Sequence, residues 1–418
     1  MTILKMKNSI KQIAKDFYHK IWCKVMYHIK LEAYWLTVPQ KVKKMRKKET
    51  IKVLFIVSEA ASWKSELLYV AMLKHPRFFP ILGISTSHDP EGAKMTLESY
   101  LKSKRYNYID LDSNVKSIKL ISPDIVFYYK PYRGCYSQGH FFNNNLNCLF
   151  CGLDYCIEVT KHAVHIEKEL FDYCWQFYVE HQDIARRRKE VLGYRSRNTI
   201  FTGVPIQDVL LLPKGMFNDP WRDNQGKKRI IYAPHHSIKG TNGNGIEFST
   251  FLDYGEGMLL FAKKYCKQVS IAFKPHPNLY KKLVNIWGKD KTDSYYNEWE
   301  TLPNTQIETG EYIGLFKYSD AIIHDSASFI VEYLFMDKPA MYLVSKTNNI
   351  DEMFDFVKQG FNCYEHGSSI NEIESFIIRV IEGNDNNSQK RREYIKTQLL
   401  PPNGGNACDN IISAILGC

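Results

Sequence analysis

The sequence contains no uninterrupted apolar run as long as a secretory signal or a membrane-spanning helix, which argues against a cleaved leader and against insertion across a bilayer. Its ten cysteines follow no repeat, and no second Cys-x-x-Cys pair accompanies Cys148 and Cys151. These absences predict a cytoplasmic chain with reduced thiols. They also argue against a zinc site built from the thiols. The sequence indicates no cofactor, and it does not reveal whether the protein requires a divalent metal.

Two further absences narrow the choice of ligand. No Gly-x-Gly-x-x-Gly follows the first apolar strand, residues 51–57, so we expect no nicotinamide or flavin dinucleotide site. The globular part also has little net charge. The whole chain has a net charge of +11. Residues 1–50 contain 13 Lys and Arg and 3 Asp and Glu, whereas the rest of the chain contains 43 Lys and Arg and 42 Asp and Glu. A basic groove across the folded domains is therefore not supported, and we expect no nucleic acid partner.

Residues 1–50 carry nearly all of the net positive charge, and lysines alternate there with apolar residues at helical spacing. The apolar positions are Ile10, Ile13, Ala14, Phe17, Ile21 and Val25. Aromatic residues that favour a membrane surface accompany them, namely Tyr18, Trp22, Tyr27, Tyr34 and Trp35. We predict an amphipathic helix on an anionic membrane surface, which would make the protein peripheral on the inner face of the cell membrane. The alternative is an ordinary surface helix docked on the domain that follows.

Beyond residue 50, strands and helices alternate in the manner of a doubly wound parallel sheet. Between segments of helical spacing, apolar runs of strand length occur at residues 51–57, 80–84, 124–129 and 199–205. A polar linker at residues 213–228 precedes a second series of strands. We therefore predict an α/β protein with two Rossmann-like domains, residues 51–212 and 229–418. The last helix is a candidate to pack back on the first domain.

The strands of the second domain end in residues that suit phosphate binding. Residues 230–236 are Ile-Ile-Tyr-Ala-Pro-His-His, the strand 269–273 continues into Lys-Pro-His-Pro, and the strand 321–323 continues into His-Asp-Ser-Ala-Ser. Because the carboxyl ends of parallel strands meet at one edge, we expect a pyrophosphate site there, at the start of the following helix. The predicted site residues are Pro234, His235, His236, Lys274, His276, Thr309, Gly310, Asp325, Ser326, Ala327, Ser328 and Glu332. The simpler explanation of the serines is that they cap an ordinary helix.

Taken in order, these motifs resemble those of the CDP-glycerol glycerophosphotransferase family, the teichoic-acid type polymerases and primases with a GT-B architecture. The resemblance spans about residues 120–345. It rests on Gly203-Val204-Pro205 with Asp208, Tyr232-Ala233-Pro234, Lys274-Pro275-His276-Pro277, Asp325-Ser326-Ala327-Ser328, Glu332-Tyr333 and Asp337-Lys338-Pro339. It implies two Rossmann-like domains facing across a cleft, with CDP and its diphosphate held by the second.

One motif of the family is missing. The family's first domain carries His-Gly-Thr-Pro, whose histidine is the candidate general base, and this chain has no such motif. The local counterpart is Cys151-Gly152, with His140 and Asp154 nearby. Both of these residues are therefore candidates for the base that takes the proton of the acceptor hydroxyl.

The resemblance implies transfer of glycerol phosphate, or a related alditol phosphate, from a CDP-activated donor to a hydroxyl of a lipid-linked glycan, with release of CMP. Such a reaction belongs to the synthesis of a cell-surface polysaccharide of the teichoic acid or capsule type. We expect Lys274 and His276 to stabilise charge on the reacting phosphate. His235 or His236 would assist the leaving group, and Glu332 would bind the ribose.

Two alternatives belong to other functional classes. A GT-B glycosyltransferase that uses a sugar nucleotide would present the same strand ends, and the released nucleotide distinguishes it, because sugar transfer usually releases a nucleoside diphosphate. A membrane-tethered scaffold without catalytic activity would bind no nucleotide. The missing His-Gly motif keeps this second alternative open.

Overall fold

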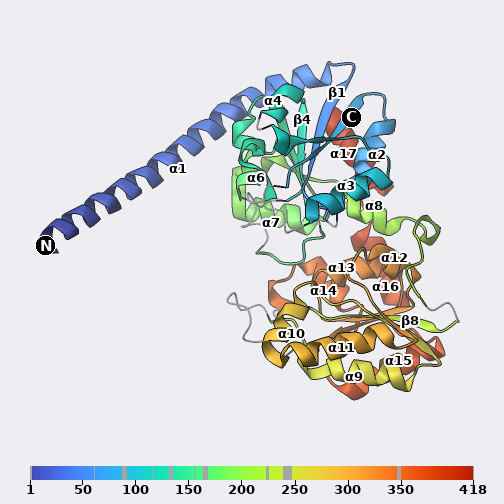
Figure 1. Ribbon diagram of the computed structural model, residues 1–418. Helices are drawn as coiled ribbons and strands as arrows, with labels where there is room; N and C mark the ends of the chain where they lie inside the picture. The colour runs from blue at the N-terminus through green and yellow to red at the C-terminus, as the bar shows by residue number, and fades with distance from the viewer. Residues whose placement is uncertain are drawn as a thin grey trace.

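Two parallel sheets, each covered by helices, form the two domains of the protein (Figure 1). The computed structural model describes residues 2–60, 62–86, 92–114, 116–130, 135–154, 156–162, 168–222, 226–238, 247–345 and 350–417. For residues 2–21, 24, 93, 138, 143, 168 and 169 it describes the backbone alone. The predicted α/β fold with two doubly wound sheets is confirmed.

The first domain is built on a seven-stranded sheet in the order β3-β2-β1-β4-β5-β6-β7. Its strands are β1 Ile51–Val57, β2 Phe78–Ile84, β3 Tyr108–Asp110, β4 Ile125–Tyr128, β5 Leu149–Leu153, β6 Gln176–Val179 and β7 Thr199–Phe201. The helices are α2 Glu66–Lys74, α3 Ala93–Ser103, α4 Ser117–Ile121, α6 Lys168–Tyr173, α7 Gln182–Leu192 and α8 Pro205–Leu211. β1 is apolar at every position except Lys52, because helices cover both faces of a central parallel strand.

The second domain is built on a six-stranded parallel sheet in the order β10-β9-β8-β11-β12-β13. Its strands are β8 Lys228–Ala233, β9 Val269–Phe273, β10 Thr305–Ile307, β11 Ala321–His324, β12 Ala340–Leu343 and β13 Glu365–Gly367. The helices are α9 Phe251–Lys264, α10 Leu279–Trp287, α11 Lys289–Thr301, α12 Ile313–Tyr318, α13 Phe329–Glu332, α14 Asp355–Phe361, α15 Ile370–Glu382, α16 Ser388–Tyr394 and α17 Ala407–Leu416.

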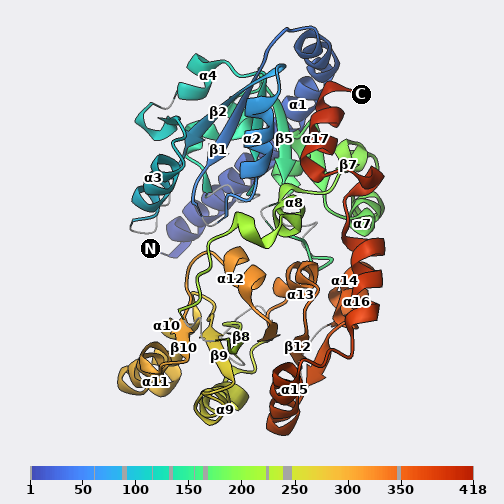
Figure 2. The same ribbon diagram turned by 90° about the vertical axis from the view of Figure 1, so that its right-hand side faces the viewer.

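The last part of the chain crosses from the second domain to the first (Figure 2). Helix α17 packs against α2 and α8 of the first domain. Asp208 fixes its start, because the carboxylate accepts hydrogen bonds from the backbone N–H groups of Ala407 (2.7 Å) and Cys408 (2.8 Å). An acidic side chain at the N-terminus of a helix also interacts favourably with the helix dipole. The two domains are therefore connected by α17 as well as by the linker.

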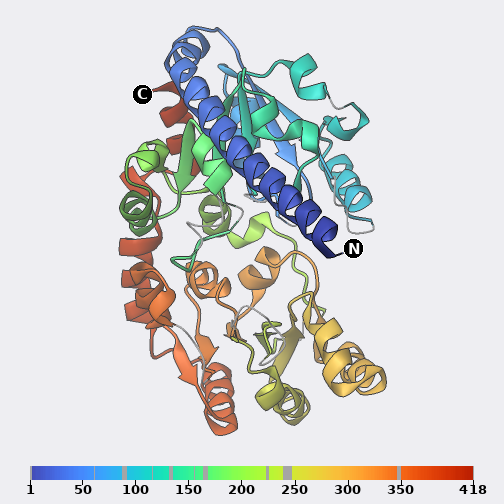
Figure 3. The same ribbon diagram turned by 90° about the vertical axis from the view of Figure 1, so that its left-hand side faces the viewer.

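Helix α1, Thr2–Arg46, runs across one side of the first domain, and its N-terminal part extends beyond it (Figures 1 and 3). The predicted apolar stripe from Ile10 to Ile21 and the aromatic Tyr18 belong to residues whose side chains lie outside the described part of the structure. Among the described residues, no helix has a stretch long and apolar enough to cross a membrane.

Three of the aromatic residues assigned to the membrane pack against the first domain instead. Tyr34 is 2% exposed and lies beside the ring of Tyr173, at 5.8 Å between centroids. The hydroxyl of Tyr27 donates to the carboxylate of Asp172 (2.8 Å), and Nε1 of Trp35 donates to the carbonyl of the same residue (2.9 Å). The burial of Tyr34 and the bonds of Tyr27 and Trp35 to Asp172 dock the helix on the first domain, so this part of the membrane prediction was wrong.

The outward side of α1 keeps an apolar stripe. Trp22, Val25, Ile29 and Leu36 are between 45% and 80% exposed, and their spacing of three, four and seven residues puts them on one helical face. Leu31 and Val38, on the opposite helical face, are buried against the domain. The second half of α1 thus has two apolar faces, of which one is covered by the protein.

Candidate active site

The strand ends after β8 and β9 bring three histidines together at the carboxyl edge of the second sheet. The backbone N–H of His276 donates to the carbonyl of Pro234 (3.2 Å), which ties the two segments to each other. The ring centroid of His276 lies 5.2 Å from that of His235 and 4.0 Å from that of His236. These predicted site residues therefore form one cluster, which we call the histidine cluster.

The histidine cluster is electrically neutral at physiological pH. Burial is the main cause that lowers the pKa of His235 to about 3 and that of His276 to about 4, and it also lowers the pKa of His236. The neighbouring rings and Lys282 lower the first two further, because cations repel. The backbone N–H of Asn278 donates to Nδ1 of His276 (3.1 Å), so the proton of this ring is on Nε2.

Lys274 supplies a fixed cation beside the cluster. Its side chain is buried, and Nζ donates to the carbonyl of Gly310 (2.9 Å), in the predicted Thr309-Gly310 segment that follows β10. Burial lowers the pKa of Lys274 to about 8, an effect that Glu308 and Glu311 oppose. The amine is therefore mostly protonated at neutral pH, and it has been partly desolvated in advance of any ligand.

Asp325 connects the segments at this edge of the sheet through hydrogen bonds, and its side chain is completely buried. Its carboxylate accepts hydrogen bonds from the backbone N–H groups of His235 (2.5 Å) and Thr250 (2.6 Å) and from the Thr250 hydroxyl (2.9 Å). Burial raises the pKa of Asp325 to about 7, although these bonds favour the charged form. The contacts make Asp325 a positioning residue for the loop that carries the histidines.

The helix that follows Ser328 is short. Helix α13 has four residues and continues as a 3₁₀ turn, Tyr333–Met336. Its dipole is correspondingly small. Ser326 and Ala327 are both buried, and the Ser326 carbonyl lies 3.0 Å from Nδ1 of His324. Ser328 is exposed at the helix start and makes no capping bond with its side chain. A ligand at this edge would therefore meet a hydroxyl and short-helix N–H groups more than a macrodipole.

Glu332 lies where the two domains meet. It is 2% exposed, and the hydroxyl of Tyr312 donates to its carboxylate (2.5 Å). From the first domain, Lys64 lies 4.6 Å from the centre of the Tyr312 ring and 3.6 Å from the carboxylate of Glu311. Burial raises the pKa of Glu332 to about 7, while Tyr312, Lys64 and the backbone of Ile157 oppose that shift. The role of Glu332 at a ribose stays a prediction.

The two candidate bases of the first domain have different surroundings. Nδ1 of His140 lies 3.0 Å from the hydroxyl of Ser85, and Nε2 lies 3.2 Å from that of Ser117. The ring is 1% exposed, and burial lowers its pKa. Asp154 follows β5 and is also buried. Burial raises the pKa of the Cys156 thiol, and the charges of Asp154 and Glu332 raise it further, so Asp154 lies near the junction of the domains.

The family profile described as CDP-Glycerol:Poly(glycerophosphate) glycerophosphotransferase matches residues 160–417. The chain belongs to this family. It is therefore a glycerophosphotransferase-like enzyme, and the predicted resemblance is confirmed. No curated protein sequence matches the chain significantly.

Solved structures place the fold of this glycerophosphotransferase-like enzyme in the GT-B class. A histidine variant of the wall teichoic acid polymerase TagF aligns with a TM-score of 0.60 at 11% identity, over 94% of this chain and 97% of that chain. UDP-GlcNAc 2-epimerase from Neisseria meningitidis, bound to UDP-GlcNAc, aligns with a TM-score of 0.59 at 16% identity, over 88% and 100% of the two chains. At these identities the likeness shows the fold alone.

Sequence patterns alone did not single out Lys64, which reaches Glu311 and Tyr312 of the second domain, or a second cation of the first sheet, Lys130. Lys64 follows β1, and Lys130 follows β4 and pairs with Glu59 (2.7 Å). Lys130 lies just after the end of β4, and Lys64 lies in the segment between β1 and α2, so both are cations on the carboxyl side of central strands, which is the signal that identified Lys274 in the second domain. The same test, applied to the first sheet, would have found them.

Proposed function

We propose that this enzyme transfers glycerol phosphate, or a related alditol phosphate, from a CDP-activated donor to a hydroxyl of a lipid-linked glycan. The observation that carries the proposal is the position of Lys274, His276 and Ser328 after strands β9 and β11, at one edge of a parallel sheet in a chain of this family. A cation, neutral N–H donors and a free-standing hydroxyl are the groups that bind a diphosphate without a glycine-rich loop.

On the donor side, Lys274 and Nε2–H of His276 would bind oxygens of the diphosphate, and Ser328 with the N–H groups of α13 would bind the others. The acceptor hydroxyl attacks the phosphorus that carries the alditol. The bond from that phosphorus to the bridging oxygen then breaks, and its electron pair leaves with CMP. Groups that hold the bridging and terminal oxygens lower the barrier because negative charge grows there.

On the acceptor side, a base must take the proton of the hydroxyl as the new bond forms. We assign this role to Asp154 in preference to His140. Both ring nitrogens of His140 already contact hydroxyl groups, and its pKa is lowered by burial. Asp154 lies near Glu332 of the facing domain, as their joint effect on Cys156 indicates.

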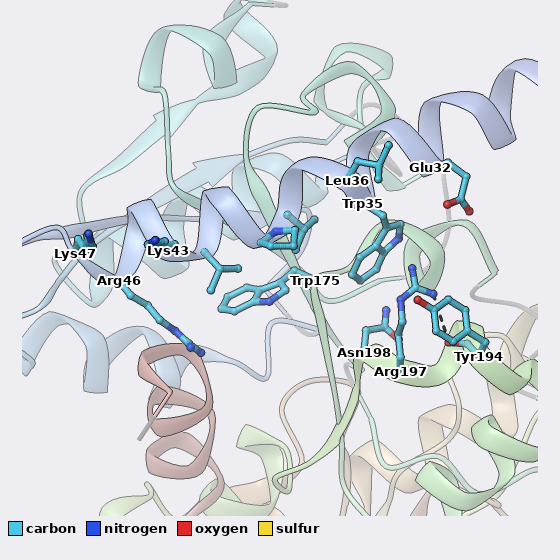
Figure 4. Close-up of a pocket in the computed structure, with 13 residues that line it drawn as sticks. Glu32, Trp35, Leu36, Lys43, Arg46, Lys47, Trp175, Tyr194, Arg197 and Asn198 are labelled. Carbon is cyan, nitrogen blue, oxygen red and sulfur yellow. Dashed lines mark hydrogen bonds between the residues drawn. The ribbon is translucent and has the colours of Figure 1, made fainter.

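Helix α1 supports the proposal that the enzyme works on a membrane surface. Its outward stripe of Trp22, Val25, Ile29 and Leu36 is exposed, and Leu36 also lines an open groove of about 990 Å³ beside the helix. In Figure 4 the rings of Trp35 and Trp175 lie in this groove, with Lys43, Lys47 and Arg197 around it. Trp35, bonded to Asp172, belongs to the protein side of the groove. The exposed Leu36 beside these cations matches the interface of an anionic bilayer.

The reaction is tested by incubating the enzyme with CDP-glycerol and short synthetic lipid-linked acceptors, and following the phosphorus products by NMR. We expect CMP and a new phosphodiester from the wild type, and a loss of rate of about 100-fold or more in His276→Ala. Lys281→Ala, on the exposed side of α10, is the matched control and should retain full rate. Release of CDP, or full activity of His276→Ala, would contradict the proposed mechanism.

A further inference from the structure

The histidine cluster has the geometry of a metal site. His235, His236 and His276 each offer one ring nitrogen, and these three atoms all lie within 4.8 Å of one another. Among the described residues, no other group of three His, Cys, Asp or Glu side chains meets this condition. Nitrogens bound to one tetrahedral zinc ion are about 3.3 Å apart, given Zn–N bonds of roughly 2.0–2.1 Å. Small rotations of the rings would close the remaining distance.

One atom of the cluster lacks a partner. Nδ1 of His236 is shielded from solvent and makes no hydrogen bond with the described residues. Burying a polar nitrogen without a partner is unfavourable, so native structures usually satisfy such atoms. A bound cation would supply the missing partner.

In the two other rings Nδ1 accepts a backbone hydrogen bond, from the Ser237 N–H to His235 (3.2 Å) and from the Asn278 N–H to His276 (3.1 Å). Binding a metal through Nε2 would therefore move the proton of each ring to Nδ1, and both bonds would be lost. For His235 the Ser237 hydroxyl, 2.7 Å from Nδ1, accepts a bond from the Phe248 N–H (2.8 Å) and has a second lone pair for an Nδ1–H, which is the kind of support that metal ligands have. The two lost contacts are weak beside two bonds to a metal.

Charge decides what the fourth ligand is. Imidazole ligands bring no negative charge to a metal, and the amines of Lys274 and Lys282 lie near the ring of His276. A dication here would be repelled by both amines unless an anion came with it. A three-histidine site also leaves one position open, as catalytic zinc sites do.

We propose that His235, His236 and His276 bind a divalent transition-metal cation of the zinc class, whose open position takes an oxygen of the donor diphosphate. The binding of the metal stands on the cluster itself, and only the diphosphate at the open position rests on the proposed function. There the cation would take the place of the Nε2–H of His276 on the diphosphate and act as a Lewis acid, withdrawing charge from the phosphate that leaves as CMP. Lys274 would remain a second, permanent cation on the same diphosphate.

The test uses the full-length protein without a histidine tag, freed of metal with a chelator, and titrated with Zn²⁺ alone. We expect saturable binding of one ion per chain, and affinity weaker by about 10–100-fold or more in His236→Ala. His162→Ala removes an exposed histidine elsewhere and is the control. His236→Asn serves as a second variant if the alanine variant does not fold, as judged by circular dichroism.

Co²⁺ identifies the ligands by its visible spectrum. Intense bands of a four-coordinate nitrogen and oxygen site, lost in His236→Ala, would support the proposal. A thiolate charge-transfer band, or equal binding by wild type and His236→Ala, would overturn it. CDP-glycerol is titrated into the same metal-free protein. Donor binding without any Zn²⁺ binding would refute the metal site alone, and Zn²⁺ binding without donor binding would refute the proposed function alone.

Discussion

Replacement of Glu332 by glutamine isolates the cost of a buried carboxylate at the domain junction. The wild-type group is 2% exposed, and burial raises its pKa from 4.5 to about 7. The groups that face it are the Tyr312 hydroxyl, the Lys64 amine, the Glu311 carboxylate and the backbone of Ile157. Glutamine keeps the shape and the acceptor oxygen for Tyr312, and it never ionises.

The sign of the effect follows from the direction of the shift. Because the folded protein holds the Glu332 proton more tightly than the unfolded chain, this group favours folding fully below pH 4.5 and loses that contribution as pH rises through about 7. At about 1.4 kcal/mol per pKa unit, the loss is about 3 kcal/mol. As pH rises from 5 to 8, the unfolding free energy of Glu332→Gln should therefore increase relative to that of the wild type, by up to about 3 kcal/mol. Above pH 8 the difference should not grow further.

Urea unfolding of both proteins at half-unit steps of pH measures this difference. The comparison is made between the two proteins at each pH, because a two-domain chain need not unfold in one step. The other titratable groups contribute equally to the unfolding free energy of both proteins, so their contributions cancel in the difference. A stability difference that stays constant from pH 5 to pH 8.5 would refute the assignment of a raised pKa to Glu332.

Three further predictions concern other parts of the molecule. Asp325→Ala should lower the unfolding free energy by about 3 kcal/mol or more in urea, because it leaves buried donors without an acceptor. Asp154→Asn should lower the rate of transfer while calorimetry shows unchanged donor affinity. Ile29→Ser with Leu36→Ser should reduce cosedimentation with anionic vesicles, whereas Leu260→Ser, at an equally exposed position of α9, should not.

Much of the sheet architecture could be predicted because parallel strands covered on both faces are apolar throughout. Residues 51–57 and 269–273 were predicted as strands with the bounds that the structure has. Strands β3 and β13 were missed, since each has three residues and lies at a sheet edge, where the pattern is short and partly polar. Such strands depend on their neighbours for definition more than on their own sequence.

The sequence predicted which strand ends form the candidate site, but not the burial, protonation or hydrogen bonding of the residues there. The pattern brought His235, His236 and His276 to one edge, and they form one cluster. It could not show that burial keeps them neutral, nor that Asp325 is occupied by backbone donors beneath them. Burial and hydrogen bonding depend on which segments pack together, and those contacts are made by residues distant in the chain.

The docking of α1 shows the same limit. An amphipathic helix with aromatic residues fits a membrane and a protein surface equally well in sequence. Asp172, which binds both Tyr27 and Trp35, is more than 130 residues away from them in the chain. Tyr34 packs against Phe150 and Tyr173, which are more than 110 residues away from it. Only the fold reveals which face of the helix the protein covers.

The most direct test of the central claim is calorimetric titration of the full-length enzyme with CDP-glycerol, CDP and a panel of sugar nucleotides. The account predicts preferential binding of CDP-glycerol, weakened about tenfold or more in Ser328→Ala and in Lys274→Ala, each of which removes a contact to the diphosphate. Lys281→Ala should bind as the wild type does. Preference for a sugar nucleotide, or no binding of any nucleotide, would contradict the assignment of this sheet edge to a CDP-alditol donor.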